Sequence, residues 1–428
     1  MKLIALSTEQ APHIYVPLRF FAVAPLFLVL ATLMLALDGG NPFTNSHTPA
    51  LLAATHCITL GFITMIMLGA LQQVLPVVIG SSLPMPRLVA WISQLTLIAG
   101  TLLLSGGFML GKPELLNSAW PLLGLTFATF ISAALTSLVR TTTQNAGKTA
   151  IFLSILALAG ATILGILLTR AYATGLTIIS PGLAVAHVNL ALGGWVLLLI
   201  VGVSYQVVPM FQLTPNYPKW LTASLAPAIF GILLLKLVLL LLNPASRWAE
   251  FAAENLLFLF AICFSVVTLM LQKRRRRRIP DATLIFYRIA MISLLCVAAL
   301  AMATQTAANV ESLKILAGLL FLLGFAMSLI FGMLYKIVPF LIWFHLFRDG
   351  TYHSIPNMKE IIPEPLMWRH LWLHACTLSA ALLAPWWDIA AWLLMLCLLL
   401  QGLLLSYALF TATAVYQRTL HHLGKPAS

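Results

Sequence analysis

Three stretches of this chain share one pattern: GFITMIMLGALQQVLP at 61–76, GWVLLLIVGVSYQVVP at 194–209 and GFAMSLIFGMLYKIVP at 324–339. Each stretch begins with glycine and an aromatic residue, carries a second glycine eight positions later, and ends in proline. The starting points are almost equally spaced along the chain. Sixteen aligned positions in three evenly spaced copies predict an internal threefold repeat.

The composition around these stretches is that of a membrane protein. Hydrophobic residues make up 61% of the 428 and charged residues 8%, with a mean hydropathy of +1.00, whereas soluble domains carry about 25% charged residues. A membrane-spanning helix needs about 20 apolar residues. The sequence therefore predicts one transmembrane domain over 1–428, all-α, with twelve spans. The predicted spans are 15–37, 50–79, 87–109, 118–139, 150–171, 182–210, 219–242, 249–272, 285–306, 313–345, 367–387 and 389–416.

The shared stretches fall in the second, sixth and tenth spans, so each repeat contains four helices. The repeats cover approximately 15–140, 150–272 and 285–416. An even number of helices gives parallel repeats, which are related by an axis along the membrane normal. We expect three four-helix units around a pseudo-threefold axis.

The orientation follows from the basic residues, which concentrate in cytoplasmic loops. With the N-terminus inside, only Lys112, Arg170, Arg247 and Lys314 of the 24 lysines and arginines lie in outer loops. We predict a multi-pass protein of the bacterial inner membrane with both termini cytoplasmic. The basic run at 273–278 is interpreted as an anchor that contacts anionic lipid, not as a nucleic-acid site.

The shared pattern itself has two interpretations. Two glycines eight apart differ by about 80° around a helix, so they clear one side for a neighbouring helix or for a flat ligand. The proline is expected to kink or end the helix near the cytoplasmic face. The polar residue three before it, which is Gln73, Gln206 or Lys336, is expected to bond carbonyls freed by the kink.

Histidines are the main candidates for chemistry, because ionisable side chains within a membrane are functional candidates by default. His56 and His187 lie shortly before the first glycine of the first and second stretches, at matched depth in the outer half. Neutral imidazole is a ligand for haem iron and copper. His370 and His374 form an i, i+4 pair that could face one metal, but anchoring at the interface beside tryptophans is the favoured interpretation.

Some function classes are disfavoured. All eleven acidic residues are predicted in loops or at helix ends, and proton-driven carriers usually need a carboxylate within the membrane. No P-loop is present, which excludes a P-loop ATPase. Lys236, deep in the seventh span, has no evident acidic partner.

Two segments resemble a known family. AHVNLALGGWVLLLIVGVSYQVVPMF at 186–211 resembles the HxH-containing helix of nitric oxide reductases and C-type haem-copper oxidases, with Asn189 in place of the second histidine. THCITLGFITMIMLGALQQVLP at 55–76 resembles the helix 2 motif, whose histidine ligates the low-spin haem. Twelve helices and pseudo-threefold symmetry are also features of that catalytic subunit. The NnrS-type haem and copper proteins, tied to nitric oxide handling, are a similar offshoot.

The resemblance implies a divergent protein that binds haem b, with His56 and His187 as axial ligands. Gly61, Gly69, Gly194 and Gly202 would then admit the macrocycle. A second version assigns His187 to haem and His56 to copper. Expected roles are electron transfer, or sensing and handling of nitric oxide, with respiratory or nitric oxide-metabolism proteins as partners. Two alternatives stay open: a cofactor-free transporter or permease, and an assembly or scaffold protein of a respiratory complex.

Overall fold

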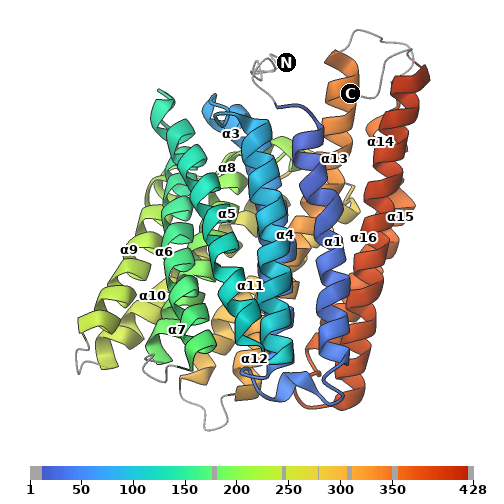
Figure 1. Cartoon of the computed structure of the whole chain (residues 1–428). Coiled ribbons are helices and arrows are strands. Elements are labelled where there is room, and N and C mark those ends of the chain that lie inside the picture. The colour runs from blue at the N-terminus through green and yellow to red at the C-terminus, as the bar shows by residue number, and fades with distance from the viewer. Residues whose placement is uncertain are drawn as a thin grey trace. The chain divides into compact units, whose positions relative to one another are not determined.

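The computed structural model describes residues 12–175, 181–242, 247–277, 279–305, 311–348 and 355–422 (Figure 1). Regular structure in these residues is entirely helical. Eleven of the described helices are long and apolar enough to cross a membrane, which agrees with the predicted all-α membrane protein. Arg278 and both chain ends, which entered the prediction of orientation, lie outside the described residues.

The helices follow the predicted spans in order. They are α1 (Tyr15–Ala36), α2 (Pro49–His56), η3 (Cys57–Thr64), α3 (Met65–Ile79), α4 (Pro86–Leu110), α5 (Pro113–Arg140), α6 (Ala146–Thr174), α7 (Pro181–Val188), η4 (Asn189–Leu197), α8 (Leu198–Gln212), α9 (Lys219–Leu242), α10 (Arg247–Lys273), α11 (Ala282–Thr304), α12 (Glu311–Leu319), η5 (Leu320–Met327), α13 (Ser328–Arg348), α14 (Met358–Ile361), α15 (Glu364–Ala381) and α16 (Asp388–His422), with a short 3₁₀ turn η2 (Pro42–Thr44).

The eleventh predicted span, 367–387, corresponds to α15, which has 18 residues. This helix carries Arg369, His370 and His374, and it is not among the eleven apolar helices. Polar side chains lower its hydropathy, and their placement matters for the site described below.

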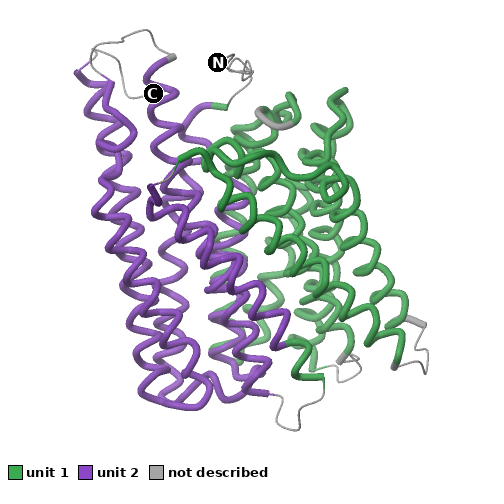
Figure 2. The backbone as a smooth tube through the Cα atoms, turned by 180° about the vertical axis from the view of Figure 1, so that it is seen from behind, with its two compact units in different colours: residues 1–12, 70–278, 301–306 green, residues 13–69, 279–300, 307–428 purple. Residues whose placement is uncertain are grey.

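The chain forms two compact units, coloured separately in Figure 2. Unit 1 comprises residues 1–12, 70–278 and 301–306, and unit 2 comprises 13–69, 279–300 and 307–428. Within unit 1, α6 packs against α5, η4, α8 and α9. Within unit 2, α1 packs against η3 and α16, and α16 also contacts α13 and α15.

Each of the three shared stretches begins inside a π-helical segment. Gly61 lies in η3, Gly194 in η4 and Gly324 in η5. A π-helical turn inserts an extra residue into the helix, and such turns are frequent at functional sites. His56 directly precedes η3, and Asn189 is the first residue of η4.

The prolines lie within helices. Pro76 lies inside α3, Pro209 inside α8 and Pro339 inside α13. The helix continues for three residues beyond the first two and further beyond the third, so proline does not end the helix. A proline costs an interior helix one backbone hydrogen bond, a defect that a packed membrane helix tolerates when neighbouring groups compensate.

Candidate functional site

His56 ends α2 and is half-buried in unit 2. Its Nδ1 lies 2.7 Å from the carbonyl oxygen of Leu52, one turn earlier. A carbonyl only accepts, so Nδ1 carries the proton and the lone pair of the neutral ring is on Nε2. The helix starts locally at Thr48, whose hydroxyl accepts from the backbone N–H of Leu51 at 3.3 Å, with Pro49 in the first position.

His187 lies near the end of α7 in unit 1 and is also half-buried. Its Nδ1 bonds the carbonyl oxygen of Ala161, on α6, at 2.9 Å. The imidazole can reach that carbonyl because Gly165, one turn further along α6, has no side chain. A Cβ at Gly165 would lie 3.0 Å from Cε1 of His187. The ring is therefore held by a second helix, with Nε2 as the remaining ligand atom.

The two predicted haem ligands thus belong to different units, and their joint ligation stays a prediction. The two histidines nevertheless have similar local surroundings. Each ring donates Nδ1–H to a backbone carbonyl, as metal-ligating histidines commonly do, and each lies within two residues of a π-helical segment. Neither Ala161 nor Gly165 was identified from the sequence, since a contact through a backbone carbonyl leaves no residue pattern.

The paired glycines of unit 1 allow close helix packing. A Cβ on Gly202 would lie 2.7 Å from Cβ of Ala150 on α6. A Cβ on Gly194 would overlap the side chain of Ala157, two turns further along the same helix. The second glycine pair is therefore covered by α6.

The first and third glycine pairs make the same kind of contact in unit 2. Gly61 and Gly69 are covered by side chains of α1, where a Cβ on Gly69 would lie 2.7 Å from Cβ of Phe20. On α13 a Cβ at Gly332 would lie 3.0 Å from Cβ of Phe286 on α11. Helix packing, one of the two interpretations that the sequence left open, accounts for all these positions.

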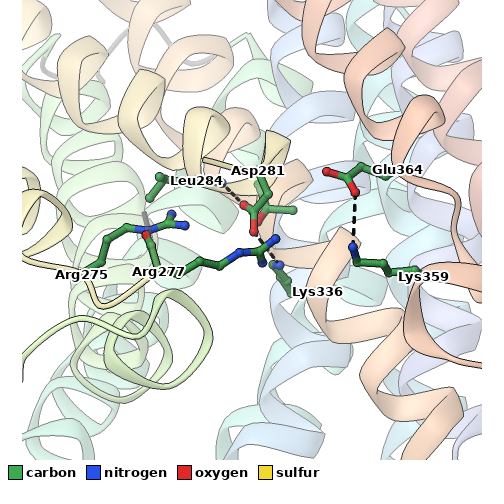
Figure 3. A network of polar contacts seen from close by, with 8 residues as sticks. Arg275, Arg277, Asp281, Leu284, Lys336, Lys359 and Glu364 are labelled. Carbon is green, nitrogen blue, oxygen red and sulfur yellow. Dashed lines mark hydrogen bonds and ion pairs between the residues drawn. The ribbon is translucent and has the colours of Figure 1, made fainter. Parts of the chain in front are cut away.

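Lys336 has a carboxylate partner instead of the predicted carbonyls. Its Nζ lies 3.1 Å from an Asp281 oxygen, and Figure 3 draws this ion pair as a dashed line. Asp281 also caps α11 by accepting from Leu284 N–H at 3.0 Å. Burial alone would raise the pKa of Asp281, but the charge of Lys336 and the bonds from Thr283 and Leu284 outweigh burial and lower the pKa. The pair ties α11 to α13.

The prediction that His370 and His374 anchor the interface is wrong. Both side chains are 0% exposed, whereas Trp372, on the opposite face of α15, is 69% exposed. Successive residues of a helix differ by 100°, so the tryptophan faces outward and the histidines face inward. The inward face meets α13 and α16 of unit 2.

Hydroxyl groups of α13 bond both rings. Tyr335 Oη lies 2.6 Å from Nδ1 of His370, and Ser328 Oγ lies 2.6 Å from Nε2 of His374. Ser328 and Tyr335 are seven residues apart, or two turns, so they present one stripe to the i, i+4 pair. The repeat gave a partial signal for this stripe, because Tyr335 aligns with Tyr205.

The donors around His374 can be assigned from chemistry. Nδ1 of His374 lies 3.1 Å from Oε1 of Gln401 on α16, an acceptor, so Nδ1 carries the proton. The Gln401 amide donates in turn to Thr377, and Thr377 donates to the Leu373 carbonyl at 2.9 Å. The neutral His374 ring therefore accepts at Nε2, from Ser328.

The described residues contain no group of three or more His, Cys, Asp or Glu side chains placed to hold a metal. These residues offer single or paired imidazoles as ligands. In each imidazole, Nδ1 is held by a hydrogen bond.

Comparison of the chain with protein-family models and with curated proteins finds no match.

Proposed function

We propose that this chain is a haem-binding protein of the bacterial inner membrane, related in architecture to the catalytic subunit of haem-copper oxidases. His56, in unit 2, and His187, in unit 1, are each proposed as an iron ligand through Nε2. The roles that follow are electron transfer or the sensing and handling of nitric oxide. The single observation that carries the proposal is the bond from His187 Nδ1 to the Ala161 carbonyl, 2.9 Å away on another helix.

The chain's own residues prepare each imidazole for ligation. The carbonyls of Leu52 and Ala161 hold the proton on Nδ1, which fixes the tautomer, orients the ring and raises the basicity of Nε2. The contact with Gly165 restricts rotation of the His187 ring. When bound, haem would supply one-electron chemistry and a site for small diatomic ligands. The proposal rests on the histidines and not on the glycines.

The threefold repeat is part of the same proposal. Three π-helical segments at matched positions, and three glycine pairs packed on the preceding long helix, support duplication of one four-helix unit. Parallel repeats of this kind occur in membrane proteins. The third copy carries Ala317 and Leu319 at the places corresponding to the two histidines, so the iron ligands come from the first two copies.

The test is an absorption spectrum of the detergent-purified protein expressed with ample haem, oxidised and reduced. We expect a Soret band with sharp reduced α and β bands. Both His56→Ala and His187→Ala should lose it, whereas His345→Ala, a matched change of a buried histidine bonded to the Leu341 carbonyl, should keep it. Loss in one variant only would assign the other histidine to copper or to structure. A colourless wild type contradicts the proposal.

A transporter without cofactor is the second candidate, and a polar stripe in unit 1 favours it. Among the described residues, Tyr205 Oη, Gln212 Nε2, Ser265 Oγ and Gln272 Oε1 are buried without a hydrogen-bond partner. Unpaired polar atoms within a membrane are costly, and a polar solute would relieve that cost. Solute-dependent thermal stabilisation of a colourless protein would support transport over haem binding.

A further inference from the structure

We propose that Gln212 and Gln272, which join the ends of α8 and α10 in unit 1, bind a small neutral molecule with an amide-type edge. Such an edge has an N–H donor beside a C=O acceptor. The starting observation is the single hydrogen bond between the two side chains, in which Nε2 of Gln272 donates to Oε1 of Gln212 at 2.9 Å. Binding here needs no haem. The use of the site rests on the second candidate function, because the proposal names the class of solute that a transporter would take.

Each of the two amides has an atom left over from this bond. Gln272 is 0% exposed and Gln212 is 6% exposed. Among the described residues, Nε2 of Gln212 and Oε1 of Gln272 have no hydrogen-bond partner. Rotating both amides by 180° exchanges oxygen and nitrogen, but one N–H···O bond between two primary amides always leaves one NH₂ and one C=O. The pair therefore offers one donor and one acceptor in either orientation.

The backbone holds the two glutamines side by side. Leu213, which follows Gln212 at the end of α8, has a left-handed backbone with φ 56° and ψ 40°. A leucine in that region is strained, and such strain is concentrated at functional sites. The N–H of Arg276, just after α10, donates to the Leu213 carbonyl at 3.0 Å. This bond ties the ends of the two helices together and fixes the position of the amide pair.

The same sides of α8 and α10 carry a second pair of unpaired polar groups. Tyr205 and Ser265 each precede one of the two glutamines by seven residues, which is two turns or about 10 Å of helix. Their hydroxyls also have no hydrogen-bond partner among the described residues. The unpaired atoms therefore follow two matching helix faces and do not arise from one misplaced side chain.

The charges near the amide pair favour a neutral ligand. Neither α8 nor α9 contains an acidic residue, and those of α10 are Glu250 and Glu254. Gln272 follows Glu254 by 18 residues, or about 27 Å of helix, so a bound cation would be buried without a balancing charge, which is costly. An anion would be repelled by the acceptor Oε1 of Gln272, and the adjacent Lys273 is exposed.

Water is the alternative occupant of this position. A single water would make two bonds to the amide pair, which is the lower limit for an internal water. An amide edge makes the same two bonds and displaces that water. If the atoms are held by water alone, no amide will stabilise the protein, so the two occupants are distinguished by experiment.

The test is the melting temperature of the full-length protein in detergent, with acetamide as the probe. Acetone is the matched control, because it has the shape and carbonyl of acetamide but no N–H, and acetate is the anionic control. At about 100 times its Kd, we expect acetamide to raise the melting temperature by about 5–10 °C. Acetone and acetate at the same concentration should not raise it. The same result is expected for protein expressed with or without added haem.

The variant that removes the acceptor is Gln272→Met, which should abolish the shift with acetamide. Gln94→Met, the same change at a buried glutamine of α4 in unit 1, should retain it. The comparison of the three solutes uses the wild type, so it tests the site even if Gln272→Met does not fold.

Three results would overturn the proposal: no shift with acetamide, equal shifts with acetone or acetate, or a full shift in Gln272→Met. Uptake of labelled acetamide into vesicles that contain the protein is a separate measurement. Stabilisation without uptake would support the binding site and contradict the transporter.

Discussion

Replacing Gly202 by alanine tests whether the glycine pairs exist for helix packing. The added Cβ would lie 2.7 Å from Cβ of Ala150, and 3.4 Å from both the Gly147 carbonyl oxygen and the Ile151 amide nitrogen. Carbon atoms prefer a separation of about 3.5–4.0 Å. Alanine has no rotamer with which to move its Cβ, so α6 and α8 must separate by about 1 Å.

The expected cost follows from two opposing effects. Overpacking of this kind costs about 1–3 kcal/mol, while alanine gains up to about 1 kcal/mol over glycine as a helix former. Gly231→Ala is the matched control, because Gly231 lies in α9 of the same unit and a Cβ there meets nothing within 4 Å. Subtracting the control removes the effect of helix propensity and leaves the clash.

The assay is reversible unfolding of the purified protein in a denaturing-detergent titration, monitored by tryptophan fluorescence. We expect Gly202→Ala to be less stable than Gly231→Ala by about 1–3 kcal/mol, with the control at or above wild type. Equal stability of the two variants would refute the packing argument. It would mean that the space beside Gly202 is open, as a flat ligand would require.

Three further predictions test other contacts. Gly165→Val should displace the His187 ring, since even a Cβ there lies 3.0 Å from Cε1, and should lower the haem content or shift the Soret band; an unchanged spectrum per protein would refute that contact. Asp281→Asn should lower the melting temperature at pH 7, and the difference should disappear once the pH has fallen below the lowered pKa of Asp281. The folded-state pKa of Asp281 is lowered, so its contribution is complete above the ordinary pKa and disappears as the pH falls through the lowered one; a pH-independent difference would contradict it. Gln401→Leu should cost about 1–3 kcal/mol of unfolding free energy, because it leaves a buried imidazole N–H without an acceptor, and a cost near zero would show that the amide is not that acceptor.

The membrane fold could be predicted because hydropathy and length reflect one dominant cost, that of unpaired backbone groups in lipid. The segments at 61–76 and 194–209 continue as helices for three residues beyond Pro76 and Pro209. The helices therefore do not end at the prolines, and the kink stays a prediction. Membrane helices tolerate an interior proline because neighbouring groups compensate for the lost hydrogen bond.

The histidine pair shows why the site was harder to predict. Trp372 between the two residues is an interfacial side chain, and its presence favoured an interfacial role for His370 and His374. The rotation of 100° per residue along a helix distinguishes the two faces of α15. His370, His374 and Thr377 share one face, and Trp372 lies on the opposite face. Which stripe faces the interior depends on the partners Ser328, Tyr335 and Gln401, which are distant in sequence.

The three copies of the shared pattern have the same packing residues, but they differ at one buried polar position. Eleven residues after the first glycine, the copies carry Gln72, Tyr205 and Tyr335, each with its polar atoms buried. Within the described residues, only Tyr335 has a hydrogen bond for that group, to His370. In all three stretches a π-helical turn contains the first glycine, and both glycines pack on the preceding long helix. The polar position is free to differ, since its partner comes from a helix outside the pattern. A repeat found in sequence therefore predicts the packing of all three copies, while the chemistry of each copy depends on a neighbour that the repeat does not contain.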